Sequence, residues 1–332
     1  MLGFGGAPLG DLYAPLDDAT AIETVLAALD AGIRLVDTSP LYGRGLSEHR
    51  IGTALRRRSD VPVVLSTKVG RVLAPAPRGV TRSEGYAGGL PHEARFDYSY
   101  DGAMRSLEQS MLRLGVASID IALVHDVDPW THGDDASRRQ RESLGGALRA
   151  LADLRAQGAV RAIGIGVNDA DVAERFVREA DLDCVLLAGR YSLLEQPALD
   201  RFLPLALERG VGVMLGGVFN SGILATDTPG QGSLFDYGPA DRAVVERAQE
   251  IARIAHRHGR TLPELAVQFP LRHPAVAAVV LGGANAAQLA QNSALADRPV
   301  PEEVWRELQE QGLLGTDASA RQPRAREGQP VR

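Results

Sequence analysis

Four side chains of this sequence have the residue types needed to move a proton. Asp37, Lys68 and His125 each end or interrupt an apolar, strand-like run. Tyr42 follows Asp37 by five residues, in a segment rich in turn-forming residues. A lone buried charge costs several kcal/mol, so polar groups at such positions are expected to be paired or functional. Asp37 and Lys68 lie on successive runs and are candidates for that pair.

Together these four side chains predict a proton-transfer site. A free tyrosine has a pKa of about 10, and a nearby ammonium lowers that pKa by stabilising the tyrosinate. Asp37 would hold Lys68 in place, and His125 would hydrogen-bond a substrate oxygen. The expected chemistry is proton donation to, or removal from, a carbonyl or carbinol oxygen. Structural alternatives stay open: a turn cap for Asp37, a core lysine, and a satisfied core histidine.

Lys68 is the only lysine among 36 basic residues. Arginine serves as the surface cation everywhere else, and only lysine offers a compact amine whose pKa shifts readily. Lys68 is therefore a candidate functional residue on composition alone. No His-x-x-x-His pair or carboxylate cluster accompanies His125, so we expect no metal.

Eight apolar runs, nearly continuous in Val, Ile, Leu, Ala and Gly, predict strands buried on both faces. They span residues 2–6, 34–38, 63–69, 119–125, 162–167, 184–189, 212–217 and 277–282. Helical periodicity fills the intervals, over 21–30, 47–57, 103–114, 141–157, 171–179, 199–209, 241–258, 263–271 and 286–295. This alternation predicts a single-domain (β/α)8 TIM barrel with its active site at the C-terminal face. An open doubly wound sheet is the alternative, but the first run lacks a G-x-G-x-x-G turn.

The barrel domain is expected to span 1–314, followed by a polar, disordered tail over 315–332. Three long segments follow strands and so gather at the C-terminal face, namely 71–98, 126–136 and 221–239. Asp17 or Asp18 is the expected cap of the first helix.

Composition excludes several classes of protein. The formal net charge of −6 argues against a nucleic-acid partner. The single cysteine, Cys184, rules out an internal disulfide framework and indicates a reducing compartment. We find no apolar run of membrane-spanning length and no signal peptide. The expectation is a cytoplasmic monomer or small homo-oligomer that acts on a small molecule.

Three motifs, in this order, resemble the aldo-keto reductase signature. They are Asp37-Thr38-Ser39-Pro40-Leu41-Tyr42-Gly43, Ser66-Thr67-Lys68 and Leu123-Val124-His125-Asp126. Segments 4–10, 96–102 and 188–196 are similar to the sugar 1-dehydrogenase subgroup. That subgroup includes D-threo-aldose 1-dehydrogenase, also called L-fucose dehydrogenase, and pyridoxal 4-dehydrogenase is similar to it. The resemblance covers about residues 2–310.

The resemblance implies a nicotinamide cofactor bound in an extended form across the C-terminal face. It implies Tyr42 as general acid/base, Lys68 as the group that tunes it, Asp37 as the residue that orients Lys68, and His125 as a substrate-positioning residue. Trp130 is the expected aromatic wall for a sugar, with Tyr86, Phe96, Tyr98 and Phe235 also available. The implied cofactor-binding residues are Gly6, Asn168, Gly217, Gly283, Gln288 and Asn292.

The sequence departs from the family pattern at several positions. Ala284 stands where many relatives carry an arginine for the 2′-phosphate of NADP, a loss worth roughly 1.5–3 kcal/mol. NAD is therefore favoured over NADP, with compensation by other arginines left open. Ala188 replaces a glutamine, and Gly216 replaces the aromatic that faces the nicotinamide, a position Phe219 would have to fill. Relatives also carry a hairpin before the first strand, so a natural start upstream of Met1 stays open.

The resemblance therefore predicts NAD-dependent oxidation of a cyclic hemiacetal to a lactone, with an aldose as substrate. The alternatives are pyridoxal 4-dehydrogenase activity and NADPH-dependent reduction of small aldehydes or ketones. A non-catalytic nucleotide-sensing subunit, and an isomerase that forms a Schiff base on Lys68, belong to different classes.

Overall fold

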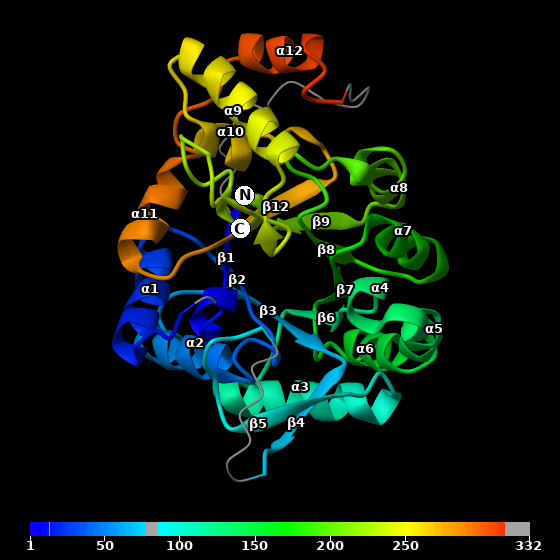
Figure 1. Ribbon diagram of the computed structural model, residues 1–332. Coiled ribbons are helices and arrows are strands. Elements are labelled where there is room, and N and C mark those ends of the chain that lie inside the picture. The colour runs from blue at the N-terminus through cyan, green and yellow to red at the C-terminus, as the bar shows by residue number, and fades with distance from the viewer. Residues whose placement is uncertain (13, 78–84, 316–332) are drawn as a thin grey trace.

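In the computed structural model, which describes residues 1–12, 14–77 and 85–315, eight parallel strands close into one barrel (Figure 1). Around the barrel they run β1 (Leu2–Gly5), β12 (Val276–Gly282), β9 (Gly212–Gly216), β8 (Cys184–Ala188), β7 (Ala162–Val167), β6 (Ile121–His125), β3 (Val64–Val69) and β2 (Leu35–Asp37). Each predicted run became a strand, with bounds within two residues of the expected ones. The predicted (β/α)8 fold is confirmed. The predicted tail lies, from residue 316 on, outside the described residues.

Helices surround the barrel, as Figure 1 shows. They are α1 (Asp18–Asp30), α2 (Leu46–Arg57), α3 (Tyr100–Leu114), α4 (Pro129–His132), α5 (Ala136–Gly145), α6 (Ala147–Ala156), α7 (Ala170–Glu179), α8 (Phe202–Arg209), α9 (Arg242–Arg257), α10 (Leu262–Gln268), α11 (Ala286–Ala294) and α12 (Glu302–Glu310). Asp17 caps α1, because its carboxylate accepts from Thr20 N at 2.8 Å. No described helix has the length and apolarity needed to cross a bilayer.

The helices differ from the sequence prediction in three places, one of which is the short helix α4, which was not predicted. The single helix expected over 141–157 is broken at Gly146 into α5 and α6. The backbone of Tyr98 approaches there: a Cβ on Gly146 would lie 2.5 Å from Tyr98 O, which instead accepts from Ala147 N at 2.8 Å. Helix α12 was not predicted, although Val304, Trp305 and Leu308 form its buried face.

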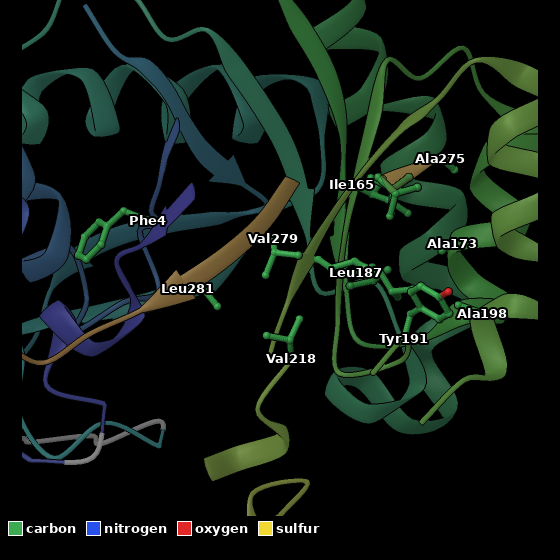
Figure 2. Close-up of a cluster of buried hydrophobic side chains, with 14 of the residues drawn as sticks. Phe4, Ile165, Ala173, Leu187, Tyr191, Ala198, Val218, Ala275, Val279 and Leu281 are labelled. Carbon is green, nitrogen blue, oxygen red and sulfur yellow. The ribbon is translucent and has the colours of Figure 1, made fainter. Parts of the chain in front are cut away.

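Strand side chains alternate between two apolar layers. The inner layer is a small cluster inside the barrel, made of Leu35, Leu123, Cys184, Leu186, Met214, Ala278 and Val280. Outward-facing side chains pack under the helices. Figure 2 shows Ile165 and Leu187 of the strands together with Ala173 of α7 and Tyr191 in this outer layer. The barrel is therefore a packed scaffold, and polar groups at its mouth stand on rigid strands.

Two of the long segments contain antiparallel hairpins. Strands β4 (Arg71–Pro75) and β5 (His92–Phe96) pair with each other and lie along α3 (Figure 1). Strands β10 (Leu234–Phe235) and β11 (Gly238–Pro239) form a short hairpin after β9. Asp236 and Tyr237 at its tip both have positive φ, as a two-residue hairpin turn requires.

Candidate active site

Strand register brings the polar residues to one face. Asp37 pairs with Ser66, and Lys68 lies two residues beyond Ser66 on the same strand. Lys68 pairs with Leu123, and His125 lies two residues beyond Leu123. Side chains alternate along a strand, so Asp37, Lys68 and His125 all point into the barrel. They stand at the C-terminal ends of β2, β3 and β6.

The Lys68 ammonium has three short hydrogen bonds. Its Nζ donates to Asp37 Oδ2 at 2.6 Å, to Thr38 O at 2.8 Å and to Tyr42 Oη at 3.0 Å. Lys68 is 1% exposed, so all three of its N–H donors are satisfied within the protein. Gly166 on β7 leaves room for the side chain, since a Cβ there would lie 3.3 Å from Lys68 Cε.

The turn after β2 fixes Tyr42 over Lys68. The backbone of Gly10 packs so closely on this turn that a Cβ there would lie 2.4 Å from Tyr42 C. Gly43 follows with a φ of 62°, which glycine adopts without strain. Asp37 is fixed in turn, because Ser66 Oγ donates to its Oδ1 at 2.8 Å.

Burial raises the pKa of the Tyr42 phenol well above its usual value, and the carboxylates of Asp37 and Asp126 raise it further. The prediction that Lys68 lowers this pKa is therefore wrong as a net direction. Desolvation penalises the phenolate, and the ammonium is already balanced by the Asp37 carboxylate. Tyr42 is a neutral phenol at neutral pH in this structure.

His125 lies beside Tyr42, with ring centroids 6.0 Å apart in an edge arrangement. Its Nδ1 is 3.1 Å from Ser39 Oγ and 3.3 Å from Arg71 Nη1. Its Nε2 is 3.4 Å from Asp126 Oδ1. Burial lowers the pKa of His125 well below its usual value, with Arg71 and Lys68 adding to the effect. The imidazole is neutral at neutral pH.

Sequence reasoning assigned no role to two of these neighbours, Arg71 and Asp126. They form a buried ion pair, with Arg71 Nη2 at 2.8 Å from Asp126 Oδ2. Asp126 has a φ of 50°, and the Tyr98 hydroxyl lies 2.8 Å from the carbonyl oxygens of both His125 and Asp126. Position in the sequence was the available signal, because Asp126 directly follows the apolar strand β6 and Arg71 lies two residues beyond the end of β3.

The loop aromatics do not all reach the mouth of the barrel. Tyr86 is buried, with its ring centroid 6.3 Å from that of Tyr42. Tyr98 is fully buried and supports the backbone below His125. Phe96 packs on the Arg71 guanidinium. Trp130 on α4 is 66% exposed, so its ring is not packed into the buried cluster formed by Asp37, Lys68 and His125.

The opposite side of the mouth is lined by small residues. Asn168 and Gly217 line a cavity of about 70 Å³ together with Ala188, Gly189, Arg190, Asn220, Ser221, Asp236 and Tyr237. Arg190 spans it, donating to Asn168 O at 2.8 Å and pairing with Asp236 at 3.1 Å. A Cβ on Gly216 would meet nothing closer than 3.7 Å. A cavity of this size is well below the roughly 300–1,000 Å³ of a typical ligand pocket, so it marks open space on this side of the mouth and not a formed dinucleotide site.

The remaining predicted cofactor residues lie beside β12 and β1. Asn285 caps α11 by accepting from Gln288 N at 2.9 Å, and Gln288 Oε1 accepts from Ala284 N at 3.0 Å. Asn292 Nδ2 donates to Gly282 O at 3.1 Å. Gly6 packs between α2 and the end of β2, because a Cβ there would lie 2.6 Å from Ser47 Oγ and 3.1 Å from Asp37 O.

A barrel whose buried Asp, Lys and His surround a partly buried Tyr, opposite a glycine-rich half of the mouth, is typical of one class of oxidoreductase. The chain belongs to the aldo/keto reductase family, which it matches over residues 1–312. Enzymes of this family use nicotinamide cofactors and act on small molecules. In the part of the chain that the structure describes, no three His, Cys, Asp or Glu side chains gather as metal ligands.

Two relatives cover nearly the whole chain. The chain is 42% identical to a pyridoxal 4-dehydrogenase of Microbacterium luteolum, over 94% of each chain. It is 40% identical to a D-threo-aldose 1-dehydrogenase of a Pseudomonas species, over 95% of this chain and 94% of the relative. These relatives support a dehydrogenase of the aldo-keto reductase family.

Solved structures share the fold at lower identity. An aldo-keto reductase from Bacillus halodurans, in its holo form, aligns with a TM-score of 0.69 and 24% identity over 93% of this chain and 91% of its own. A glycerol dehydrogenase from Gluconobacter oxydans aligns with a TM-score of 0.73 and 22% identity over 98% and 95%.

Proposed function

We propose that this protein is an NAD-dependent dehydrogenase that oxidises the C1 hemiacetal of an aldose to a lactone. The observation that carries the proposal is the chain of contacts from Asp37 through Lys68 to the Tyr42 hydroxyl, at 2.6 and 3.0 Å. It places one ionisable oxygen at the barrel mouth, supported by a fully buried ion pair. The similarity to D-threo-aldose 1-dehydrogenase supports the choice of substrate.

In this reaction the ionised form of Tyr42, which is the minor form at neutral pH, removes the proton of the C1 hydroxyl. The C1–H bond breaks with its electron pair, and the C1–O bond becomes the carbonyl of the lactone. A nicotinamide cofactor supplies the hydride acceptor when bound. Lys68 holds the phenol oxygen and stabilises negative charge on it, and Asp37 keeps Lys68 in place. His125 positions the substrate by a hydrogen bond to the reacting oxygen.

We assign the cofactor to the glycine-lined half of the mouth. Asn168 and Gly217 would hold the nicotinamide end, Gly6 would border it, and Gly283, Gln288 and Asn292 would hold the adenosine end near the start of α11. NAD is favoured because residues 282–292 contain no arginine or lysine, and Gln288 satisfies the Ala284 amide. A 2′-phosphate would find no cation from that segment.

Pyridoxal is the second candidate substrate, because the other close relative is a pyridoxal 4-dehydrogenase. Its cyclic hemiacetal undergoes the same oxidation to a lactone. Reduction of a small aldehyde is the third candidate, and the raised pKa of Tyr42 favours it, because a neutral phenol is ready to donate a proton. Trp130 stays a predicted sugar contact, which requires α4 to present its exposed ring to the ligand.

The deciding experiment follows absorbance at 340 nm with NAD and NADP in parallel, against L-fucose, D-arabinose, L-galactose and pyridoxal. NADH formation with one sugar as the best substrate is the expected result. NADPH formation would overturn the cofactor assignment, and pyridoxal as the best substrate would overturn the aldose assignment. Nucleotide binding without turnover in either direction would favour a sensing role.

A further inference from the structure

Arg71 reaches the proposed active site from outside the barrel strands. It is the first residue of β4, directly after the Gly70 turn that ends β3, on the hairpin that lies along α3 (Figure 1). Its side chain is 7% exposed, and its guanidinium lies on the ring of Phe96 at 4.6 Å. The hairpin therefore places the buried Arg71 guanidinium at the proposed active site.

The contact between Arg71 and His125 determines the hydrogen positions of the imidazole. Arg71 Nη1 lies 3.3 Å from His125 Nδ1. A guanidinium has only donors, so this contact is favourable only when Nδ1 is an unprotonated acceptor. Ser39 Oγ, at 3.1 Å, can donate to the same nitrogen, since it already accepts from Leu41 N. A neutral imidazole must then carry its hydrogen on Nε2.

Asp126 completes the arrangement from the other side of the ring. Its Oδ1 lies 3.4 Å from His125 Nε2, and its Oδ2 pairs with Arg71 at 2.8 Å. The left-handed backbone of Asp126 turns its carboxylate back toward these groups, and the Tyr98 hydroxyl contacts that backbone. Strain of this kind persists only where the surroundings fix it.

The charged and titratable groups around His125 come from several elements. They are Lys68 from β3, Arg71 from β4, Tyr42 from the turn after β2, Tyr98 below the backbone, and Asp126 next in the chain. Arg71 and Lys68 oppose a positive charge on the imidazole, and Asp126 favours one. Because Asp126 is itself paired with Arg71, repulsion and burial dominate.

We propose that Arg71 is a positioning residue that, braced by Asp126, holds His125 as a neutral imidazole with its hydrogen on Nε2. In that state the Nε2–H of His125 is available for the hydrogen bond to the substrate oxygen that the proposed function already gives it, and what is new is that Arg71 fixes this state. The inference rests on the proposed function for the role of His125 toward substrate. The state of the ring itself stands on the contacts above.

The first test uses the wild-type protein. Nitrogen-15 NMR of histidine-labelled enzyme, with the His125 signals identified by their loss in His125→Gln, reports which ring nitrogen is protonated. We expect an unprotonated Nδ1 and a protonated Nε2 at neutral pH and through the usual titration range of histidine, because burial lowers the pKa of His125 well below its usual value. A hydrogen on Nδ1 in the neutral ring, or protonation of the ring between pH 6 and 7, would overturn the proposal.

The second test compares variants of Arg71 with a matched control on the same hairpin. In Arg71→Met the His125 ring should protonate at higher pH, and kcat/KM should gain an inflection there, with a roughly tenfold or greater loss below it. Arg71→Lys keeps the charge and should retain most of the wild-type profile. Arg95→Met removes an exposed arginine from β5 and should change neither the NMR signals nor the profile.

Adding the Asp126→Asn substitution distinguishes two explanations of the Arg71→Met result. In Arg71→Met/Asp126→Asn the carboxylate left unpaired is also removed, so any remaining rise in the protonation of His125 comes from the lost guanidinium. A double variant with the wild-type NMR titration would show that Arg71 acts only by neutralising Asp126, and would overturn the proposal. Because the NMR readout needs no turnover, it decides the role of Arg71 even if no proposed substrate is oxidised.

Discussion

The two halves of the barrel mouth are built from opposite kinds of residue. Asp37, Lys68 and His125 lie at the C-terminal ends of β2, β3 and β6 and are buried, and Lys68 Nζ donates to Asp37 at 2.6 Å. Strands β7, β8 and β9 end next to Asn168, Gly189 and Gly217, which line a small cavity. The side chains of one half are closed by contacts with one another, and the other half retains a cavity of about 70 Å³.

The difference follows from what each half must hold. Buried charges are tolerated only when they are paired and hydrogen-bonded. In a buried proton-transfer site every polar group therefore needs a hydrogen-bond or ion-pair partner. A site for an extended dinucleotide needs close backbone approach and few side chains, which glycine provides. We call the ends of β2, β3 and β6 the packed half and the ends of β7, β8 and β9 the open half. On the proposed function, the packed half transfers the proton and the open half binds the cofactor.

The strongest test of this division is Tyr42→Phe. Removing the hydroxyl deletes the only group that the proposal uses to move the proton, so kcat should fall by roughly 10²–10⁴-fold. The dissociation constant of the nicotinamide cofactor, measured by fluorescence titration, should stay close to wild type. Tyr100→Phe, on the outer helix α3, removes a hydroxyl bonded to Asp153 and should leave kcat unchanged. A normal kcat in Tyr42→Phe would disprove the mechanism.

The packed half should also be the half whose charges matter for stability. Lys68→Met leaves the Asp37 carboxylate buried without its cation, which costs about 3–5 kcal/mol in the free energy of unfolding. Urea denaturation measures this loss. Lys68→Met/Asp37→Asn removes both charges and should recover a large part of it. Equal stability of the single and double variants would mean that the ion pair is not what holds this half together.

The pH dependence of the reaction should reflect the Tyr42 phenol. Because burial raises its pKa, the base form becomes more populated as pH rises through neutrality. The kcat/KM for oxidation should therefore increase by up to about tenfold per pH unit without a plateau near pH 7. The kcat/KM for reduction, which needs the protonated phenol, should stay flat over the same range. An oxidation plateau at neutral pH would show that another group is the base.

The sequence was sufficient for the barrel and for the residues of the packed half. Strands buried on both faces are continuous apolar runs, and a charge in such a run is conspicuous, as Asp37, Lys68 and His125 were. Arg71 and Asp126 were harder to recognise, because their partnership crosses from a hairpin to a barrel strand. The break at Gly146 depends on the backbone of Tyr98, which lies far away in sequence.

Electrostatics was the least predictable property of the site. Counting charges suggested that Lys68 lowers the pKa of Tyr42, but that count omits burial, which depends on the packing of the whole mouth. The open half poses a different problem. Its small residues give little signal in the sequence, and the predicted contacts of Gly283, Gln288 and Asn292 involve a ligand that the chain does not contain.

Adjacent glycines of the open half provide the finest test of the comparison. Gly217 has a φ of 64°, and a Cβ there would lie 3.1 Å from Gly189 N. Gly217→Ala should therefore cost about 1–2 kcal/mol in the free energy of unfolding and weaken cofactor binding. Gly216→Ala, with no atom closer than 3.7 Å, should leave stability unchanged or raise it slightly.

A glycine-to-alanine substitution at Gly166 tests the packed half in the same way. A Cβ there would lie 3.3 Å from Lys68 Cε and 3.7 Å from His125 Cδ2. Gly166→Ala should therefore displace Lys68 and lower kcat while leaving the dissociation constant of the cofactor near its wild-type value. Gly217→Ala should show the reverse pattern. If each variant changed both kcat and the dissociation constant of the cofactor, the two halves of the mouth would be one coupled site. A methyl group on either side would then alter the function of the other side.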